Sequence, residues 1–165
     1  MNSPSSVLHL HTDSIGTGPD LVILHGLFGS GENWRNQARK LSAHFTVHSM
    51  DARNHGDSPH QPAMSYPLMA DDVIATCNHL QLDRICLLGH SMGGKTAMQI
   101  ALKKPELIDR LIIVDIGPQQ YPHHHDRIVQ GLQTLQRSPA ASRRAADEHL
   151  SAYVEDKFVR AFLLK

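Results

Sequence analysis

The stretch that most constrains the fold is residues 82–98, which read LDRICLLGHSMGGKTAM. A short apolar run leads into the segment GHSMG at 89–93, and residues that favour a helix follow directly. This order predicts a strand, a tight turn with a serine at its apex, and a helix that begins at the next residue. Gly89 and Gly93 flank Ser91 at the spacing G-x-S-x-G, and small residues on both sides let the backbone turn sharply between packed elements.

Such a turn would lift the Ser91 hydroxyl clear of the sheet, at the positive end of the following helix. An oxyanion formed beside Ser91 would then meet the backbone N–H of Met92. We therefore expect Ser91 to be a nucleophile and Met92 to contribute to an oxyanion hole. The alternative is a glycine-rich turn that serves packing alone, but the apolar run and the helix around it favour the nucleophile.

Charge and composition argue against several classes of partner. The 165 residues suffice for one domain with a core of useful size, and 16 basic residues balance 16 acidic ones, so nothing predicts binding to nucleic acid or to an anionic membrane. No apolar run reaches the roughly 18 residues of a membrane span, and the first twenty residues lack the apolar core of a secretion signal. We expect a cytoplasmic protein without a cofactor or a metal, in which Cys77 and Cys86 are small, reduced core residues.

The order of apolar runs and helical patterns predicts an α/β fold. Alternation at 7–11 suggests a half-exposed first strand, and further strands are expected at 21–24, 45–50, before the serine turn and at 111–114. Helices are expected at 33–42, 66–80 and after the serine, up to Lys103. Strands that alternate with helices predict a mainly parallel sheet flanked by helices.

The helix at 66–80 has one apolar stripe, formed by Met69, Val73, Cys77 and Leu80. Asp71 and Asp72 lie near its positive N-terminus. After Asp115 the pattern changes, because no further strand is predicted. Three polar helices are expected instead, at 126–137, 140–153 and 155–165.

Ligands bind beyond the carboxyl ends of strands in an open parallel sheet. His25 and Gly26 begin a glycine-rich loop at the end of the strand 21–24. The glycines would let the backbone N–H of Leu27 or Phe28 approach a ligand closely, as a second oxyanion donor. The alternative is a tight turn that serves only packing.

Asp115 ends the strand that we expect beside the serine strand. Adjacent strands lie about 4.8 Å apart, so its carboxylate could orient a histidine next to Ser91 and fix the tautomer of that histidine. The alternative is an aspartate that caps a helix or a turn.

A serine nucleophile also requires a general base, normally a histidine. Three candidates follow Asp115 in the chain: His123, His124 and His125. They lie in a polar segment typical of a solvated loop, and metal binding by such a tract is a weaker interpretation. His25 and His90 read as structural hydrogen-bonding residues, and His55 as a loop residue. A histidine in the expected place is therefore missing.

Four segments together resemble the YbfF-type esterases of bacteria, which belong to the α/β-hydrolase superfamily. These segments are HGLFGS at 25–30, DARNHGDS at 51–58, GHSMGGK at 89–95 and VDIGP at 114–118. The resemblance extends from about Leu21 to Lys165 and implies an α/β-hydrolase fold. It implies a serine hydrolase that acts on acyl esters or acyl thioesters, including acyl-CoA, through an acyl-enzyme on Ser91.

The resemblance also implies roles for single residues. Asp115 would be the acid of the triad, and Leu27 or Phe28 would act with Met92 in the oxyanion hole. The supporting motif residues are His25, Gly26, Gly89, His90 and Gly93.

Members of this family carry a helical cap, then two further strands, and the catalytic histidine near the C-terminus. We therefore expect residues 1–118 to be the N-terminal part of the core and residues 119–165 to be the start of a truncated cap. The C-terminal strands and the catalytic histidine would be missing, and activity would be impaired. The alternative is a non-catalytic remnant that binds a small ligand or a partner protein. Acyl chain length, leaving group and oligomeric state are left open.

Overall fold

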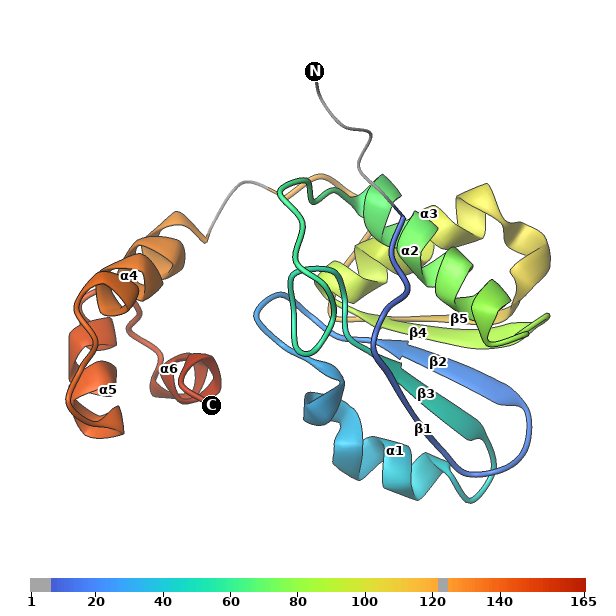
Figure 1. Cartoon of the computed structure of the whole chain (residues 1–165), viewed down its shortest axis with the longest axis horizontal. Helices are drawn as coiled ribbons and strands as arrows, with labels where there is room; N and C mark the ends of the chain where they lie inside the picture. Colours follow the sequence, from blue (N-terminus) through green and yellow to red (C-terminus); the bar gives the residue numbers. More distant parts are fainter. Residues whose placement is uncertain (1–6, 122–124) are drawn as a thin grey trace. The chain divides into compact units, whose positions relative to one another are not determined.

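The computed structural model describes residues 7–121 and 125–165. The chain divides into two compact units, residues 1–118 and 119–165. The first unit is built on a five-stranded sheet with the order β1-β3-β2-β4-β5 (Figure 1). Its strands are β1 (Thr12–Ile15), β2 (Asp20–Leu24), β3 (Thr46–Met50), β4 (Ile85–His90) and β5 (Ile108–Val114). β1 is antiparallel to β3 and all other neighbours are parallel, which confirms the mainly parallel sheet.

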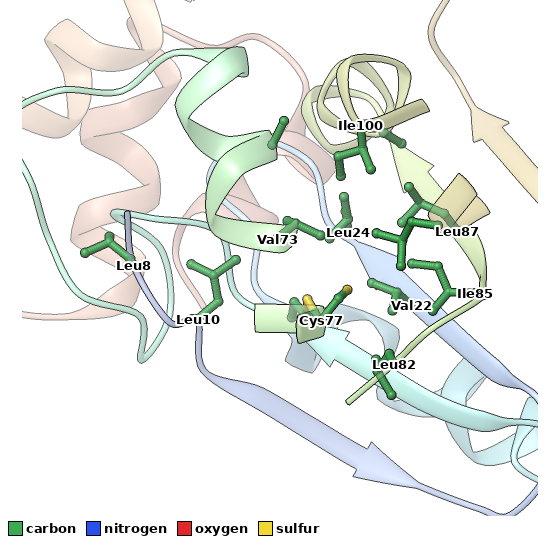
Figure 2. Close-up of a cluster of buried hydrophobic side chains, with 14 residues drawn as sticks. Leu8, Leu10, Val22, Leu24, Val73, Cys77, Leu82, Ile85, Leu87 and Ile100 are labelled. Carbon is green, nitrogen blue, oxygen red and sulfur yellow. The ribbon is translucent and has the colours of Figure 1, made fainter. Parts of the chain in front are cut away.

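Helices cover both faces of this sheet, as expected for an α/β fold (Figure 1). They are α1 (Arg35–Leu41), α2 (Tyr66–His79) and α3 (Met92–Lys103), with short 3₁₀ helices η1 (Gly31–Trp34) and η2 (Pro105–Leu107). The apolar run of β2 faces both layers, because successive side chains point to opposite faces. Val22 and Leu24 pack in the cluster with α2 and α3 (Figure 2). Leu21 and Ile23 pack on the other face with Ala38 of α1.

The first strand is where the sequence prediction is wrong. The alternation at 7–11 reflects real burial, because Leu8 and Leu10 lie in the core, but the strand β1 begins only after this segment. The N–H of Leu8 donates to Asp72 Oδ1 at 2.8 Å, and the N–H of Leu10 donates to Thr76 Oγ1 at 2.9 Å. Side chains of α2 thus bind the backbone groups that a neighbouring strand would otherwise pair.

The apolar stripe of α2 is correct except at its end. Met69, Val73 and Cys77 are buried, but Leu80 is 36% exposed because the helix ends at His79. Cys77 and Cys86 are both buried and free, as expected. Burial raises the pKa of the Cys77 thiol to about 12, which makes it a poor nucleophile.

The second unit is helical over its described residues. It contains α4 (Asp126–Arg137), α5 (Arg143–Ser151) and α6 (Lys157–Leu163), close to the predicted ranges. Leu150 of α5 is fully buried, and Gly131 of α4 lies against it. The described part of the chain has no strand after β5, and none of its described helices has the length and apolar character needed to cross a membrane. That this unit begins a cap stays a prediction.

Candidate active site

Ser91 occupies the turn between β4 and α3, where the sequence predicts it. Its backbone has φ 50° and ψ −111°, a conformation that is unfavourable for a residue with a Cβ atom. The N–H of Ser91 donates to Val114 O at 3.0 Å, and α3 begins at the next residue. The strained turn is therefore held by β5 on one side and by the helix on the other.

Gly89 and Gly93 make this turn possible through close backbone approach. A Cβ at Gly89 would lie closer than 3.0 Å to Gly93 O, and a Cβ at Gly93 would lie equally close to Leu24 O. The N–H of Gly93 donates to His25 O at 3.1 Å. The first turn of α3 is thus hydrogen-bonded directly to the loop that follows β2.

That loop is a tight turn at residues 26–29. The N–H of Gly29 donates to Gly26 O at 3.0 Å, with Leu27 and Phe28 at the centre of the turn. Phe28 has φ 62°, as the third residue of a type II turn requires. The hydrogen bond of the turn does not involve the N–H of Leu27.

The turn at 26–29 lies directly against the serine. A Cβ at Gly26 would lie 2.9 Å from His90 Nδ1 and 3.4 Å from Ser91 Cβ. A glycine at this position therefore allows the loop after β2 to approach the serine turn. The two expected sources of oxyanion donors lie side by side.

The structure distinguishes between the two expected donors of this loop. The N–H of Phe28 donates to His55 Nε2 at 3.2 Å, so it already has an acceptor. Met92 is the first residue of α3, and its N–H has no acceptor within the helix. The geometry therefore favours Leu27 over Phe28 as the companion of Met92.

Asp115 directly follows β5 beside the serine. The register pairs His90 with Val114, so Ser91 and Asp115 occupy equivalent positions after adjacent strands. Asp115 has φ 56°, and its side chain is 84% exposed. Its Oδ2 lies 3.8 Å from His90 Nε2. The carboxylate is thus accessible to a further histidine.

His25 uses both ring nitrogens within the fold. Its Nε2 accepts from the N–H of Ala52 at 3.0 Å, so Nδ1 carries the proton and donates to Gly26 O at 2.8 Å. Burial lowers the pKa of His25 from its ordinary value of 6.5. These are the contacts of a structural residue that orders the turn at 26–29.

The loop after β3 makes contacts that the sequence pattern does not predict. His55 accepts from Phe28 through Nε2, and its Nδ1 lies 2.9 Å from Arg53 O. Arg53 is fully buried and binds Asp72 of α2 through two hydrogen bonds of 2.6 and 2.7 Å. Asp72 was expected only as a residue near a helix terminus, and the arginine in the segment DARNHG was the available signal for a buried partner.

A base for Ser91 is not found among the described residues. No described histidine forms a hydrogen bond with the Ser91 side chain, and His90 is the one described histidine within ion-pair range of Asp115. His123 and His124 lie outside the described residues. His125 is exposed and belongs to the second unit.

One group of side chains in the described part of the chain could approach a metal ion. His11, Asp51 and Asp57 place ligand atoms within 4.8 Å of one another. The Asp51 carboxylate, however, accepts from the N–H of Gly31 at 2.7 Å and from the N–H of Asp57 at 2.9 Å. Through these hydrogen bonds Asp51 connects two loops, which explains its buried position. We therefore assign no metal ion to this group.

Comparison with known proteins places these features in context. The sequence profile described as "alpha/beta hydrolase fold" matches residues 19–150. A relative from Xenopus laevis, named sn-1-specific diacylglycerol lipase ABHD11, is 45% identical over 156 residues, which cover 89% of this chain and 50% of that protein. Esterase YbfF of Escherichia coli is 38% identical over 146 residues, covering 88% of this chain and 58% of the esterase.

A solved structure agrees with this relationship. The structure titled "Marine microorganism esterase" superposes with a TM-score of 0.90 at 39% identity, over 95% of this chain and 63% of that one. The chain spans about half the length of the curated relatives that it matches. The expected fold class and the resemblance to esterases are confirmed.

Proposed function

This chain belongs to the α/β-hydrolase fold family, and we propose that it is a serine hydrolase that cleaves carboxylic esters through an acyl-enzyme on Ser91. The observation that carries the proposal is the meeting of three features at one point. These are the strained serine, the free first N–H of α3 and the turn at 26–29 packed against both. Relatives named as an esterase and a lipase support ester hydrolysis.

In the proposed reaction, Ser91 Oγ attacks the ester carbonyl carbon. The carbonyl oxygen takes up negative charge and receives hydrogen bonds from the N–H groups of Leu27 and Met92. A preorganised donor of this kind stabilises the transition state by about 3 kcal/mol. The hydroxyl proton of Ser91 passes to the general base, or to water where the base is lacking, and then to the departing alkoxide, which leaves as the alcohol. Water hydrolyses the acyl-enzyme to the carboxylic acid and restores the Ser91 hydroxyl.

Asp115 is proposed to orient the general base. An exposed carboxylate next to the nucleophile can accept the Nδ1–H of a histidine and hold its Nε2 toward the serine. The described residues of the first unit do not supply that histidine. We therefore expect hydrolysis by residues 1–165 to be impaired, with the residual rate owed to the oxyanion hole.

Acyl esters are the proposed substrate class, with acyl thioesters such as acyl-CoA as the second class to compare. Both present a carbonyl carbon to the same nucleophile and place the same oxyanion in the same site. The name of the Xenopus relative makes acylglycerols a further class of ester worth comparing.

The test is hydrolysis of p-nitrophenyl acetate and butyrate by the purified chain and its Ser91→Ala and Asp115→Ala variants. We expect turnover above background that is lost in Ser91→Ala. A fall in Asp115→Ala would show that a histidine of this chain acts on the aspartate. Ser151→Ala is the matched control, because Ser151 Oγ donates to a helix carbonyl and has no basic partner.

A folded Ser91→Ala variant that hydrolyses as fast as the native chain would overturn the proposal. If both proteins were folded and equally inert, even toward acylation, the non-catalytic alternative would replace it. Binding of a small acyl ligand would then be the function to measure.

A further inference from the structure

A second serine–histidine–aspartate arrangement lies away from Ser91. Ser14 Oγ is 2.8 Å from His48 Nδ1, and His48 Nε2 is 2.9 Å from Asp20 Oδ1. Ser14 and His48 are direct partners in the pairing of β1 with β3, so their side chains share one face of the sheet. Asp20 begins β2, the next strand across.

This cluster lies among β1, β3 and β2, away from the proposed active site, which follows the C-terminal end of β4. Asp20 pairs with Thr46 at the beginning of β2 and β3, whereas Ser91 follows the end of β4. All three strands are parallel, so the starting ends of two of them lie far along the sheet from the finishing end of the third. The cluster of Ser14, His48 and Asp20 is therefore a site separate from that of Ser91.

The hydrogen bonds define the proton positions in the neutral imidazole. The Asp20 carboxylate can only accept, so His48 Nε2 carries the proton and donates to it. His48 Nδ1 then has a free lone pair, and the Ser14 hydroxyl must donate to it. A hydroxyl that donates to an imidazole anchored by a carboxylate is polarised toward attack.

Burial places each group as such chemistry requires. His48 is 6% exposed, so its ring is held by packing and by both hydrogen bonds. Asp20 is half-buried, whereas Ser14 is exposed on β1, an edge strand of the described sheet. The oxygen of the serine is thus open to reagents while its proton acceptor is fixed.

We propose that Ser14 is a second nucleophilic serine, which small activated esters acylate. Ser14 Oγ forms a bond to the acyl carbon, and the bond from that carbon to the departing oxygen or sulfur breaks. The hydroxyl proton passes to His48 Nδ1 and then to the leaving group or to water. Ser14 lies within a strand and not at a helix N-terminus, so it lacks the dipole that assists Ser91. The site is therefore expected to react with aryl esters or thioesters that have good leaving groups. One acyl group would be transferred to Ser14 of each chain.

The test is exposure of the full chain to p-nitrophenyl acetate, followed by peptide mapping of acetyl groups by mass spectrometry. The Ser91→Ala variant is run in parallel, so that the outcome at Ser14 is independent of the proposed esterase activity. We expect acetylation of Ser14 in both proteins, at a rate well above that of the exposed control Ser151.

His48→Gln should slow the acetylation of Ser14 by about 100-fold, since a positioned base contributes that much or more. Glutamine can still donate to Asp20, which preserves the buried bond. Asp20→Asn is the second variant and should slow the reaction less, because the ring remains but its tautomer is no longer fixed. Circular dichroism checks that each variant is folded. Acetylation of Ser14 no faster than that of Ser151, or a rate unchanged in both folded variants, would overturn the proposal.

Discussion

Backbone strain in the first unit gathers around the proposed site. Five described residues other than glycine have positive φ, and three of them are Phe28, Ser91 and Asp115. Each costs on the order of 1 kcal/mol or more, and such strain persists where the surroundings over-determine it. The loops after β2, β4 and β5 thus place groups beyond the sheet at the expense of a low-energy local backbone conformation.

The close backbone approach at Gly93 predicts that replacing this glycine by alanine destabilises the fold. The size of such a loss depends on the atoms that surround the glycine. Gly93→Ala should lower the free energy of unfolding by about 1–3 kcal/mol, because the added Cβ meets a backbone carbonyl that cannot move aside. Gly131→Ala is the matched control in another helix, where the three atoms nearest to the added Cβ belong to the side chains of Leu150 and Tyr153. In Gly131→Ala, the gain in helix propensity of about 1 kcal/mol should offset much of the destabilisation from this close contact. Urea unfolding measures both, and equal losses would contradict the explanation.

The buried His25 predicts a pH dependence with a definite sign. Because its folded pKa is lowered, the unfolded chain binds a proton at His25 once the pH falls below 6.5, whereas the folded chain does not. The contribution of His25 to stability is therefore present above pH 6.5 and is lost as the pH falls from there toward the folded pKa. The slope from this residue can reach about 1.4 kcal/mol per pH unit.

Urea unfolding between about pH 7.5 and pH 5.5 checks this sign. His25→Asn should be less stable at neutral pH but should lose less stability on acidification than the native chain. An equal pH slope in both proteins would show that other groups carry the dependence.

At the scale of elements, the pair Arg53–Asp72 fixes the loop after β3 to α2. Both side chains are fully buried, and the same loop brings His55 to the turn at 26–29. Asp72→Asn leaves the guanidinium buried without a counter-charge, so we expect a loss of about 3–5 kcal/mol. Asp109→Asn is the control, because the pair Arg84–Asp109 is exposed and such pairs contribute less than about 1 kcal/mol. Thermal or urea unfolding that gave similar losses would contradict this role for the buried pair.

β5 forms the other edge of the described sheet, and its apolar side chains are partly open. Ile112 is 44% exposed on a strand whose outer backbone groups have no partner strand among the described residues. Such an edge invites pairing with another chain, and a lysine opposes it. Ile112→Lys should therefore reduce self-association of residues 1–165, as measured by light scattering at rising concentration.

Leu102→Lys is the control for this edge effect. Leu102 is 81% exposed on α3, where the backbone is already hydrogen-bonded within the helix. It should change self-association less than Ile112→Lys does. The opposite order would assign the association to general surface hydrophobicity and not to the strand edge.

For the molecule as a whole, the sequence predicted the sheet better than the contacts between loops. Period and turn chemistry were enough for β2, the serine turn and α2, because these depend on local pattern. The segment 7–11 was misread as a strand, because alternation reports burial but not the identity of the hydrogen-bond partner. The partners proved to be Asp72 and Thr76 on a helix more than sixty residues away.

The proposed site likewise combines features that local sequence pattern predicts with contacts between distant segments that it does not. The positions of Ser91, Asp115 and the glycine turns followed from motif spacing. The occupation of the Phe28 N–H by His55 did not, because it depends on a loop held by a buried ion pair. Nor could local pattern reveal the cluster of Ser14, His48 and Asp20, which forms only when three strands align.

The proposed function depends on Ser91 as the nucleophile of this chain. Reaction with a fluorophosphonate tests this role, followed by peptide mapping of the adduct in the native chain and in Ser91→Ala. We expect an adduct on Ser91 that forms faster than on Ser151, even if turnover of esters is slow. A folded native chain whose Ser91 stays unmodified, or reacts no faster than Ser151, would contradict it.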